Sequence, residues 1–282
     1  MSFLVLLILI AVEKFSNGRH RIQKDSFWLN QLQQCENQTS QASSANHAIF
    51  KLTILPVIII GIIIFLLHNI FHGIFLFFID IAIMLYALGR GDLVQRFGSF
   101  RDAWRRDDQE GLKIAAERDL GLTDIDTENP NQLLHQAQSK LLWQSYEGFF
   151  AVIFWYMLLG PLIPLFYRLI ALVDDLTVNE QLRAKASFIR YYLDWLPSRI
   201  LIYSFCLVGH FTTCFDVLIK ELFNKKLSAK ELINKAGIAA VQTQEVSEEG
   251  EQISSLDILW NLLIRSAILW YVIYALFIIF IY

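Results

Sequence analysis

The sequence predicts an all-helical, polytopic membrane protein with about four to six membrane segments and cytoplasmic helical loops. Of its 282 residues, 55% are hydrophobic and 14% are aromatic, and the mean hydropathy is +0.43. This composition is more apolar than that of a soluble domain. The formal net charge is only −3, and the charged residues cluster between apolar runs. We therefore expect the lipid bilayer as a partner and no binding of nucleic acid.

Four apolar runs are predicted to cross the membrane: residues 52–67, 74–89, 149–173 and 256–282. The first two are separated by a short polar turn and form a helical hairpin, in which Pro56 lies early enough in its helix to be tolerated. Two shorter segments are possible additions. Residues 2–12 lack the flanking pattern of a cleaved signal peptide and are a marginal anchor. Residues 196–208 are short for a span and are interpreted as membrane-spanning, re-entrant or interfacial.

The polar stretches between these runs indicate the sidedness of the chain. A cluster of arginines directly follows the hairpin: Arg90, Arg96, Arg101, Arg105 and Arg106. The positive-inside rule places it in the cytoplasm, with residues 13–51 on the same side and the C-terminus outside. The side occupied by residues 174–255 stays open. Asn129 and Pro130 predict a helix start, and SAKE at 228–231 predicts a capping box.

These features predict a single integral membrane domain over residues 1–282 with six successive parts. The parts are an N-terminal anchor and loop (1–51), a helical hairpin (52–89), a cytoplasmic helical block (90–146), core membrane segments (147–210), a polar helical loop (211–255) and a C-terminal span (256–282). The acidic, serine-rich residues 245–255 are interpreted as a solvated linker. No internal repeat is apparent.

Cysteine and histidine give little sign of metal or disulfide chemistry. Three cysteines are present: Cys35, Cys206 and Cys214. Their odd number and the lack of a CxxC pair indicate free thiols rather than a disulfide framework or a zinc site. His68 and His72 share a helical face, but a metal site would need a third ligand such as Asp80. We interpret the histidines as polar residues at the hairpin turn, and no metal site is predicted.

Two positions carry charge where charge is costly in a membrane. Asp80 lies about 10 Å into the second predicted span, and an acid at that depth is a candidate functional residue, although it could simply bond a neighbouring helix. Its possible partners are Arg199 and Arg265. In the segment LDWLPSRIL, Pro197 is predicted to start a short helix that places Arg199 at the membrane rim.

Arg199 has two interpretations. Its side chain could snorkel to the membrane surface beside Trp195. Alternatively, Asp194 and Arg199 could line a polar site together with acids from another segment; the candidate acids are Glu147, Asp174 and Asp175. The second interpretation predicts that Arg199 pairs with Glu147 or Asp174.

Residues 140–176 and 193–210, together with ALGRGDL and FRDAWRRDD at 87–108, resemble the AmpE branch of the AmpE/cobalamin-biosynthesis membrane family. The related adenosylcobinamide-phosphate synthases carry GRDT, ENxxDG and WIPARL motifs. The corresponding stretches here are Arg118 and Asp119, residues 143–148, and residues 195–200. Trp143 and Gln144 replace the Glu-Asn pair, and Leu120 replaces the threonine. The resemblance and the charge pattern leave six polar-pocket candidates: Arg118, Asp119, Glu147, Asp174, Asp194 and Arg199.

The resemblance implies an inner-membrane protein linked to β-lactamase induction and cell-wall recycling, acting with a cytoplasmic anhydro-muropeptide amidase or a cell-wall-derived ligand. Because half of the synthase ligands are replaced, we expect a ligand-binding sensor or modulator, and we assign no catalytic residue and no cofactor. The alternatives are a membrane-bound, amide-forming or ligating enzyme and a purely scaffolding protein. An enzyme would need metal and nucleotide together with Glu147 or Asp119.

Overall fold

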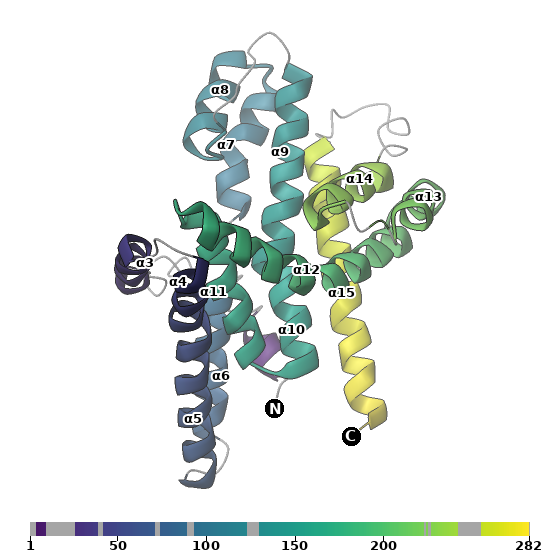
Figure 1. Cartoon of the computed structure of the whole chain (residues 1–282). Helices are drawn as coiled ribbons and strands as arrows, with labels where there is room; N and C mark the ends of the chain where they lie inside the picture. Colours follow the sequence, from purple (N-terminus) through teal and green to yellow (C-terminus); the bar gives the residue numbers. More distant parts are fainter. Residues whose placement is uncertain are drawn as a thin grey trace. The chain divides into compact units, whose positions relative to one another are not determined.

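The computed structural model describes residues 4–9, 26–38, 42–70, 74–88, 93–122, 130–222, 224, 227–241 and 255–281 (Figure 1). Every regular element in this part of the chain is a helix, which confirms the all-helical class. The chain forms two compact units. The first contains residues 1–90 and 151–195, and the second contains residues 91–150 and 196–282. The predicted linker lies outside the described residues except for Ser255.

The first unit is built around α11. Its elements are α3 (Ser26–Gln38), α4 (Ala42–Ile49), η1 (Phe50–Ile54), α5 (Leu55–Ile70), α6 (Ile74–Ala87), α10 (Ala151–Leu159), α11 (Leu162–Leu176) and the first part of α12 (Glu180–Val208). Helix α11 packs against η1, α5, α6 and α10. Its side chains from Leu169 to Val173 are all buried, and Leu32 of α3 and Leu182 of α12 join the same core. Helices α5 and α6 also contact each other, as expected for the hairpin.

Pro56 lies within a longer helical run than the sequence predicts. The run comprises α4, η1 and α5, so the proline is not in a first turn. Pro56 has no backbone N–H for the Leu52 carbonyl, its usual partner four residues earlier. The run widens to a π-helix at this point, with Leu55 N donating to Phe50 O, and the buried indole Nε1 of Trp28 donates to Leu52 O at 3.3 Å. A side chain from α3 thus supplies the donor that the proline lacks.

The predicted single span over residues 149–173 is wrong. Helix α10 ends at Leu159, and Gly160 adopts a φ of +78°, a conformation that glycine reaches without strain. Pro161 follows and α11 begins at Leu162. The two helices pack against each other as an α-hairpin. The apolar stretch that begins at residue 149 therefore runs for only about 16 Å before this break.

The second unit is organised around α9. Its elements are α7 (Leu93–Arg105), α8 (Gln109–Arg118), α9 (Pro130–Ser145), η2 (Tyr146–Phe150), the end of α12, α13 (Phe211–Glu221), α14 (Ala229–Val241) and α15 (Ser255–Ile281). Helix α9 contacts α7, α8, α14 and α15. Gly237 of α14 lies so close to Leu142 of α9 that an added Cβ would approach its Cδ1 to 2.7 Å. A larger residue at this position would therefore require the Leu142 side chain to shift.

Both predicted helix starts in the second unit are confirmed. Helix α9 begins at Pro130. In front of α14, Glu231 N donates to Ser228 Oγ at 3.2 Å, and Ser228 N donates to Glu231 Oε2 at 3.0 Å. This reciprocal arrangement is the capping box that the SAKE stretch predicts.

Two helical stretches are long and apolar enough to cross a membrane, namely Ala45–Leu67 and Ser255–Phe280. In the most apolar window of each, only 17% and 22% of the residues are buried within the protein, whereas a core helix of a soluble protein would be mostly buried. The apolar part of α6, Phe75–Ala87, is shorter. Large side chains such as Phe65 on α5 and Phe280 on α15 are exposed, as expected for surfaces that face lipid.

We predict an energetic coupling between Trp28 and Pro56. Trp28→Phe should lower the free energy of unfolding of the purified protein, through loss of the hydrogen bond to Leu52 O and of packing. Because Pro56→Ala provides a backbone donor for the same carbonyl, the cost of Trp28→Phe should be smaller by about 0.5–1.5 kcal/mol in that background. Denaturant titrations in detergent give the free energy of unfolding of the unmodified protein, the two single variants and the double variant. Trp104→Phe on α7 is the control without coupling, and equal costs of Trp28→Phe in both backgrounds would contradict the role of the indole.

Candidate functional site

The connection between α11 and α12 is short and held at both ends by polar contacts. Thr177 Oγ1 and Val178 N donate to Oε1 of Glu36 on α3, the latter at 2.7 Å. The side chain of Asn179 accepts hydrogen bonds from the backbone N–H groups of residues 181 and 182 at 3.1 Å and caps α12. The Arg183 guanidinium donates to Thr177 O at 2.6 Å. These contacts bring the last turns of α11 beside the first turns of α12.

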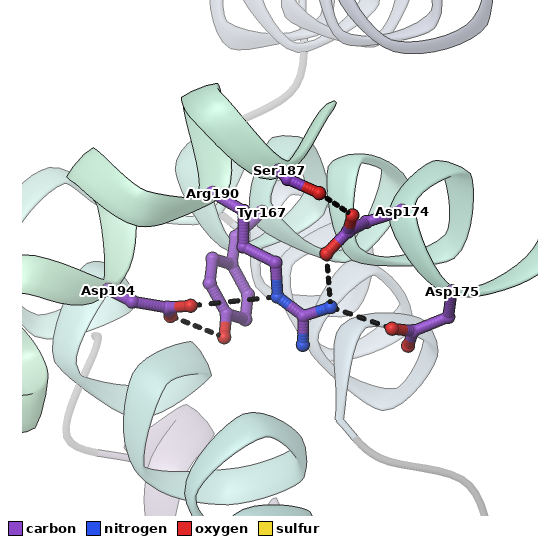
Figure 2. A network of polar contacts seen from close by, with 6 residues as sticks. All are labelled: Tyr167, Asp174, Asp175, Ser187, Arg190 and Asp194. Atoms are coloured by element: carbon purple, nitrogen blue, oxygen red, sulfur yellow. Dashed lines mark hydrogen bonds and ion pairs between the residues drawn. The ribbon is translucent and has the colours of Figure 1, made fainter. Parts of the chain in front are cut away.

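Arg190 of α12 is the centre of a network of charged groups between these two helices (Figure 2). Its Nη1 donates to Asp174 Oδ2 at 3.0 Å and to Asp175 Oδ1 at 2.7 Å. Its Nε lies 3.5 Å from Asp194 Oδ2, one helical turn away. One guanidinium therefore joins two acids at the end of α11 to a third acid on its own helix.

Two uncharged side chains complete the network. Tyr167 Oη, on α11, donates to Asp194 Oδ1 at 2.8 Å, and Ser187 Oγ donates to Asp174 Oδ1. Figure 2 shows Tyr167 and Arg190 both reaching the Asp194 carboxylate. The phenol thus hydrogen-bonds one carboxylate oxygen of Asp194, and the guanidinium forms an ion pair with the other.

The network changes from buried to exposed along its length. The side chains of Arg190 and Asp194 are 6% and 4% exposed, whereas Asp174 is 17% and Asp175 is 48% exposed. Burial of a charge is costly unless the charge is paired and hydrogen-bonded. Asp194 and Arg190 therefore serve as the fixed inner part, and Asp175 is the part that a molecule in solution can reach.

The structure brings together two of the six polar-pocket candidates, Asp174 and Asp194, through a residue that the sequence reasoning missed. Arg190 lies in the polar first half of α12, where a charge run normally indicates a solvated face. Two signals in the sequence could have found it: the i,i+4 spacing of Arg190 and Asp194, and the adjacent acids at the end of an apolar helix.

Arg118 and Asp119 form a pair of their own at the end of α8. Arg118 Nε and Nη2 donate to the two carboxylate oxygens of Asp119 at 2.8 and 2.9 Å. These contacts, with a hydrogen bond from Ser99, hold the pKa of Asp119 below its usual value. The Arg118 side chain is 66% exposed, so this bidentate pair is a surface feature.

Glu147 and Arg199 both belong to the second unit. Glu147 lies half-buried in η2, a π-helical turn of a kind that is frequent at functional sites. Arg199 is buried, with 6% exposure, and its Nε donates to Leu222 O at 2.8 Å. This buried position argues against a side chain that snorkels to the membrane surface. The pairing of Arg199 with Glu147 stays a prediction.

The expectation that Pro197 starts a helix is wrong. Helix α12 runs from Glu180 to Val208 with Pro197 in its interior. A proline removes one backbone donor from a helix, here the partner of the Leu193 carbonyl. The helix continues because its flanking residues are well packed: Ser198, Leu201 and Ile202 are fully buried. Residues 196–208 are therefore the second half of a long helix.

Asp80 lies half-buried on α6, and a functional role for it stays a prediction. The side chain of His68 and all of His72 lie outside the described residues. Among the residues that the structure does describe, no three His, Cys, Asp or Glu side chains are placed to hold a metal ion together.

We predict that Arg190 and Arg118 differ sharply in their effect on stability. Arg190→Ala should lower the free energy of unfolding by about 3–5 kcal/mol, because it leaves the buried carboxylate of Asp194 without its cation. Arg118→Ala, at an exposed pair, should change the free energy of unfolding very little. Denaturant unfolding in detergent compares the two variants, and a similar small cost for both would show that the Arg190 network does not hold α11 to α12.

Comparison with known proteins identifies the family of this chain. The family model for AmpE, described as a regulatory signalling modulator protein, matches residues 1–280. No curated protein and no solved structure shows significant similarity to the chain. Together with the two exposed apolar helices, the match indicates a membrane protein. Because the match spans essentially the whole sequence, the chain belongs to the AmpE family of regulatory signalling modulators.

Proposed function

We propose that this protein is a multi-pass regulator in the bacterial inner membrane, which acts in β-lactamase induction and cell-wall recycling by responding to a ligand at the Arg190 network. Membership of a family of signalling modulators supports a regulatory role. The observation that carries the ligand site is the network itself, in which a buried Arg190 and Asp194 are continuous with the exposed Asp175.

The charge of the network favours a ligand that carries a positive group. Three carboxylates, of Asp174, Asp175 and Asp194, face one guanidinium, so the formal charge of these four side chains is −3 + 1 = −2. An ammonium group, such as that of a cell-wall-derived peptide, could bind at Asp175 and compete with Arg190 for its carboxylate. Because Arg190 also holds Asp174 and Asp194, such competition would change how α11 and α12 are held together.

Contacts within the second unit support the proposed orientation in the membrane. Asp257, in the first turn of α15, accepts a hydrogen bond from Arg105 at 2.6 Å and one from Arg101 at 3.4 Å. The arginine-rich helix α7 therefore lies at the N-terminal end of the apolar helix α15. If the positive-inside rule holds, this end is cytoplasmic and α15 leads outward.

The proposed partner is a cytoplasmic anhydro-muropeptide amidase, as the family resemblance implies, and the proposed ligand is a product of cell-wall turnover. A regulator in the inner membrane with a large cytoplasmic helical block could act on such an enzyme directly. The alternative of an amide-forming enzyme makes a different prediction, because turnover would require nucleotide, metal and the carboxylate of Glu147.

The orientation predicts the result of reporter fusions. Alkaline phosphatase fused near residue 110 should be inactive, because the arginine-rich block is expected in the cytoplasm, whereas a fusion at Tyr282 should be active. Green fluorescent protein fused at the same two positions serves as the complementary control, since it is fluorescent only on the cytoplasmic side. An active phosphatase near residue 110 would reverse the proposed topology.

The ligand site predicts a regulatory effect of Asp175→Asn. Because Asp175 is half-exposed, its loss should leave the fold intact but shift the inducer concentration for half-maximal β-lactamase expression by up to about fivefold, corresponding to about 1 kcal/mol. The matched control is Glu180→Gln, which removes an exposed acid from the start of α12 outside the network. Immunoblots establish equal amounts of protein in the membrane.

Two results, one from this experiment and one from an assay of the purified protein, would count against the proposal. Induction that is the same for Asp175→Asn, Glu180→Gln and the unmodified protein would remove the Arg190 network from regulation. Consumption of ATP by the purified protein with magnesium and an amine, abolished by Glu147→Gln, would favour the enzyme instead.

A further inference from the structure

Two cysteines that do not belong to the Arg190 network contact each other where the chain turns in the second unit. Cys206 lies in the last turn of α12 and Cys214 in the first turns of α13. Their sulfur atoms are 2.9 Å apart, and the residues are 2% and 0% exposed. Such a distance places the two thiols in direct contact, although they are eight positions apart in the sequence.

The surrounding structure keeps this pair together. The chain turns at Gly209 and His210, and the His210 N–H donates to Ala240 O at 3.0 Å, which ties the turn to the end of α14. Thr213 Oγ1 donates to Ala239 O at 2.6 Å. A Cβ at Gly209 would come within 2.9 Å of both Ala240 Cβ and Leu262 Cδ1, so the corner also has little free volume. The two sulfur atoms are therefore held near each other by the fold.

We propose that Cys206 and Cys214 are a reversible redox pair, which forms an intramolecular disulfide when the protein meets a hydroperoxide. One thiol, as its thiolate, attacks an oxygen of hydrogen peroxide, the O–O bond breaks, and a sulfenic acid and one water form. The second sulfur then attacks the sulfenic sulfur and releases the second water. In total the two thiols lose two protons and two electrons, and the peroxide is reduced to two waters.

The change in geometry is small for a covalent step. A disulfide has an S–S bond of about 2.05 Å, so the sulfur atoms need to approach by less than 1 Å from their present separation of 2.9 Å. The product fixes the first turns of α13 to the last turn of α12. A small, uncharged oxidant suits this site, because both sulfur atoms are buried.

Cys35 supplies an internal control. It is a buried thiol of the first unit, 3% exposed, and it takes no part in this pair. Burial alone therefore does not distinguish it from the proposed pair, whereas contact with a second sulfur does. An oxidation that depends on the pair should leave the Cys35 thiol unchanged.

The test uses the full chain in detergent micelles. The folded protein is treated with hydrogen peroxide, excess oxidant is removed with catalase, and the protein is then unfolded and alkylated with iodoacetamide before peptide mass mapping. We expect alkylation of Cys206 and Cys214 to fall together, a cross-linked peptide lighter by two hydrogens to appear, and alkylation of Cys35 to persist. Dithiothreitol added before alkylation should restore all three labels.

Variants separate a true pair from two independent oxidations. In Cys214→Ser, peroxide should produce a sulfenic acid at Cys206 that dimedone traps, with no cross-linked peptide, and Cys35→Ser should behave as the unmodified protein. If either variant fails to fold, the peptide map of the unmodified protein still decides the matter. Fully alkylated cysteines after peroxide treatment, a cross-link that involves Cys35, or only sulfinic acid at Cys206 and Cys214 would overturn the proposal.

Discussion

The ion pairs of Arg190 are the constraint on which the arrangement of α11 and α12 depends. A guanidinium that is only 6% exposed is strongly destabilising unless acids surround it. Here it joins Asp174 and Asp175 at the end of one helix to Asp194 on the next. The short connection capped by Asn179 sets the distance between the helices. Loss of Arg190 would thus leave the buried carboxylate of Asp194 without its cation, which would destabilise the fold.

The fold accommodates Pro56, Pro161 and Pro197 in three different ways. Beside Pro56, a π-helical turn and the Trp28 indole compensate for the absent backbone donor. At Pro161, by contrast, the chain turns, with the help of the positive φ of Gly160. Pro197 is carried within α12 by well-packed neighbours. A proline therefore lies beside a widened turn of a helix, between two helices or inside a continuous helix, according to what packs beside it.

These outcomes explain which features the sequence could predict. The helical class, the hairpin of α5 and α6, and the starts of α9 and α14 follow from local patterns, and the structure confirms them. The break at Gly160 was hidden because hydropathy averages over a window and ignores backbone conformation. Arg190 was overlooked since burial of a charged residue depends on the partner helix, and the contact of Cys206 with Cys214 depends on a turn that the sequence pattern did not reveal.

The same reasoning bears on whether the polar-pocket candidates serve chemistry or structure. Arg118 and Asp119 neutralise each other at the surface, with a bidentate hydrogen bond. Asp174 and Asp194 share Arg190, and Arg199 donates to a backbone carbonyl. A carboxylate that must activate a substrate or hold metal-bound phosphate needs an oxygen available to it. Most of these groups are instead committed to partners within the protein, which supports the proposed regulatory role rather than the alternative of turnover by the same residues.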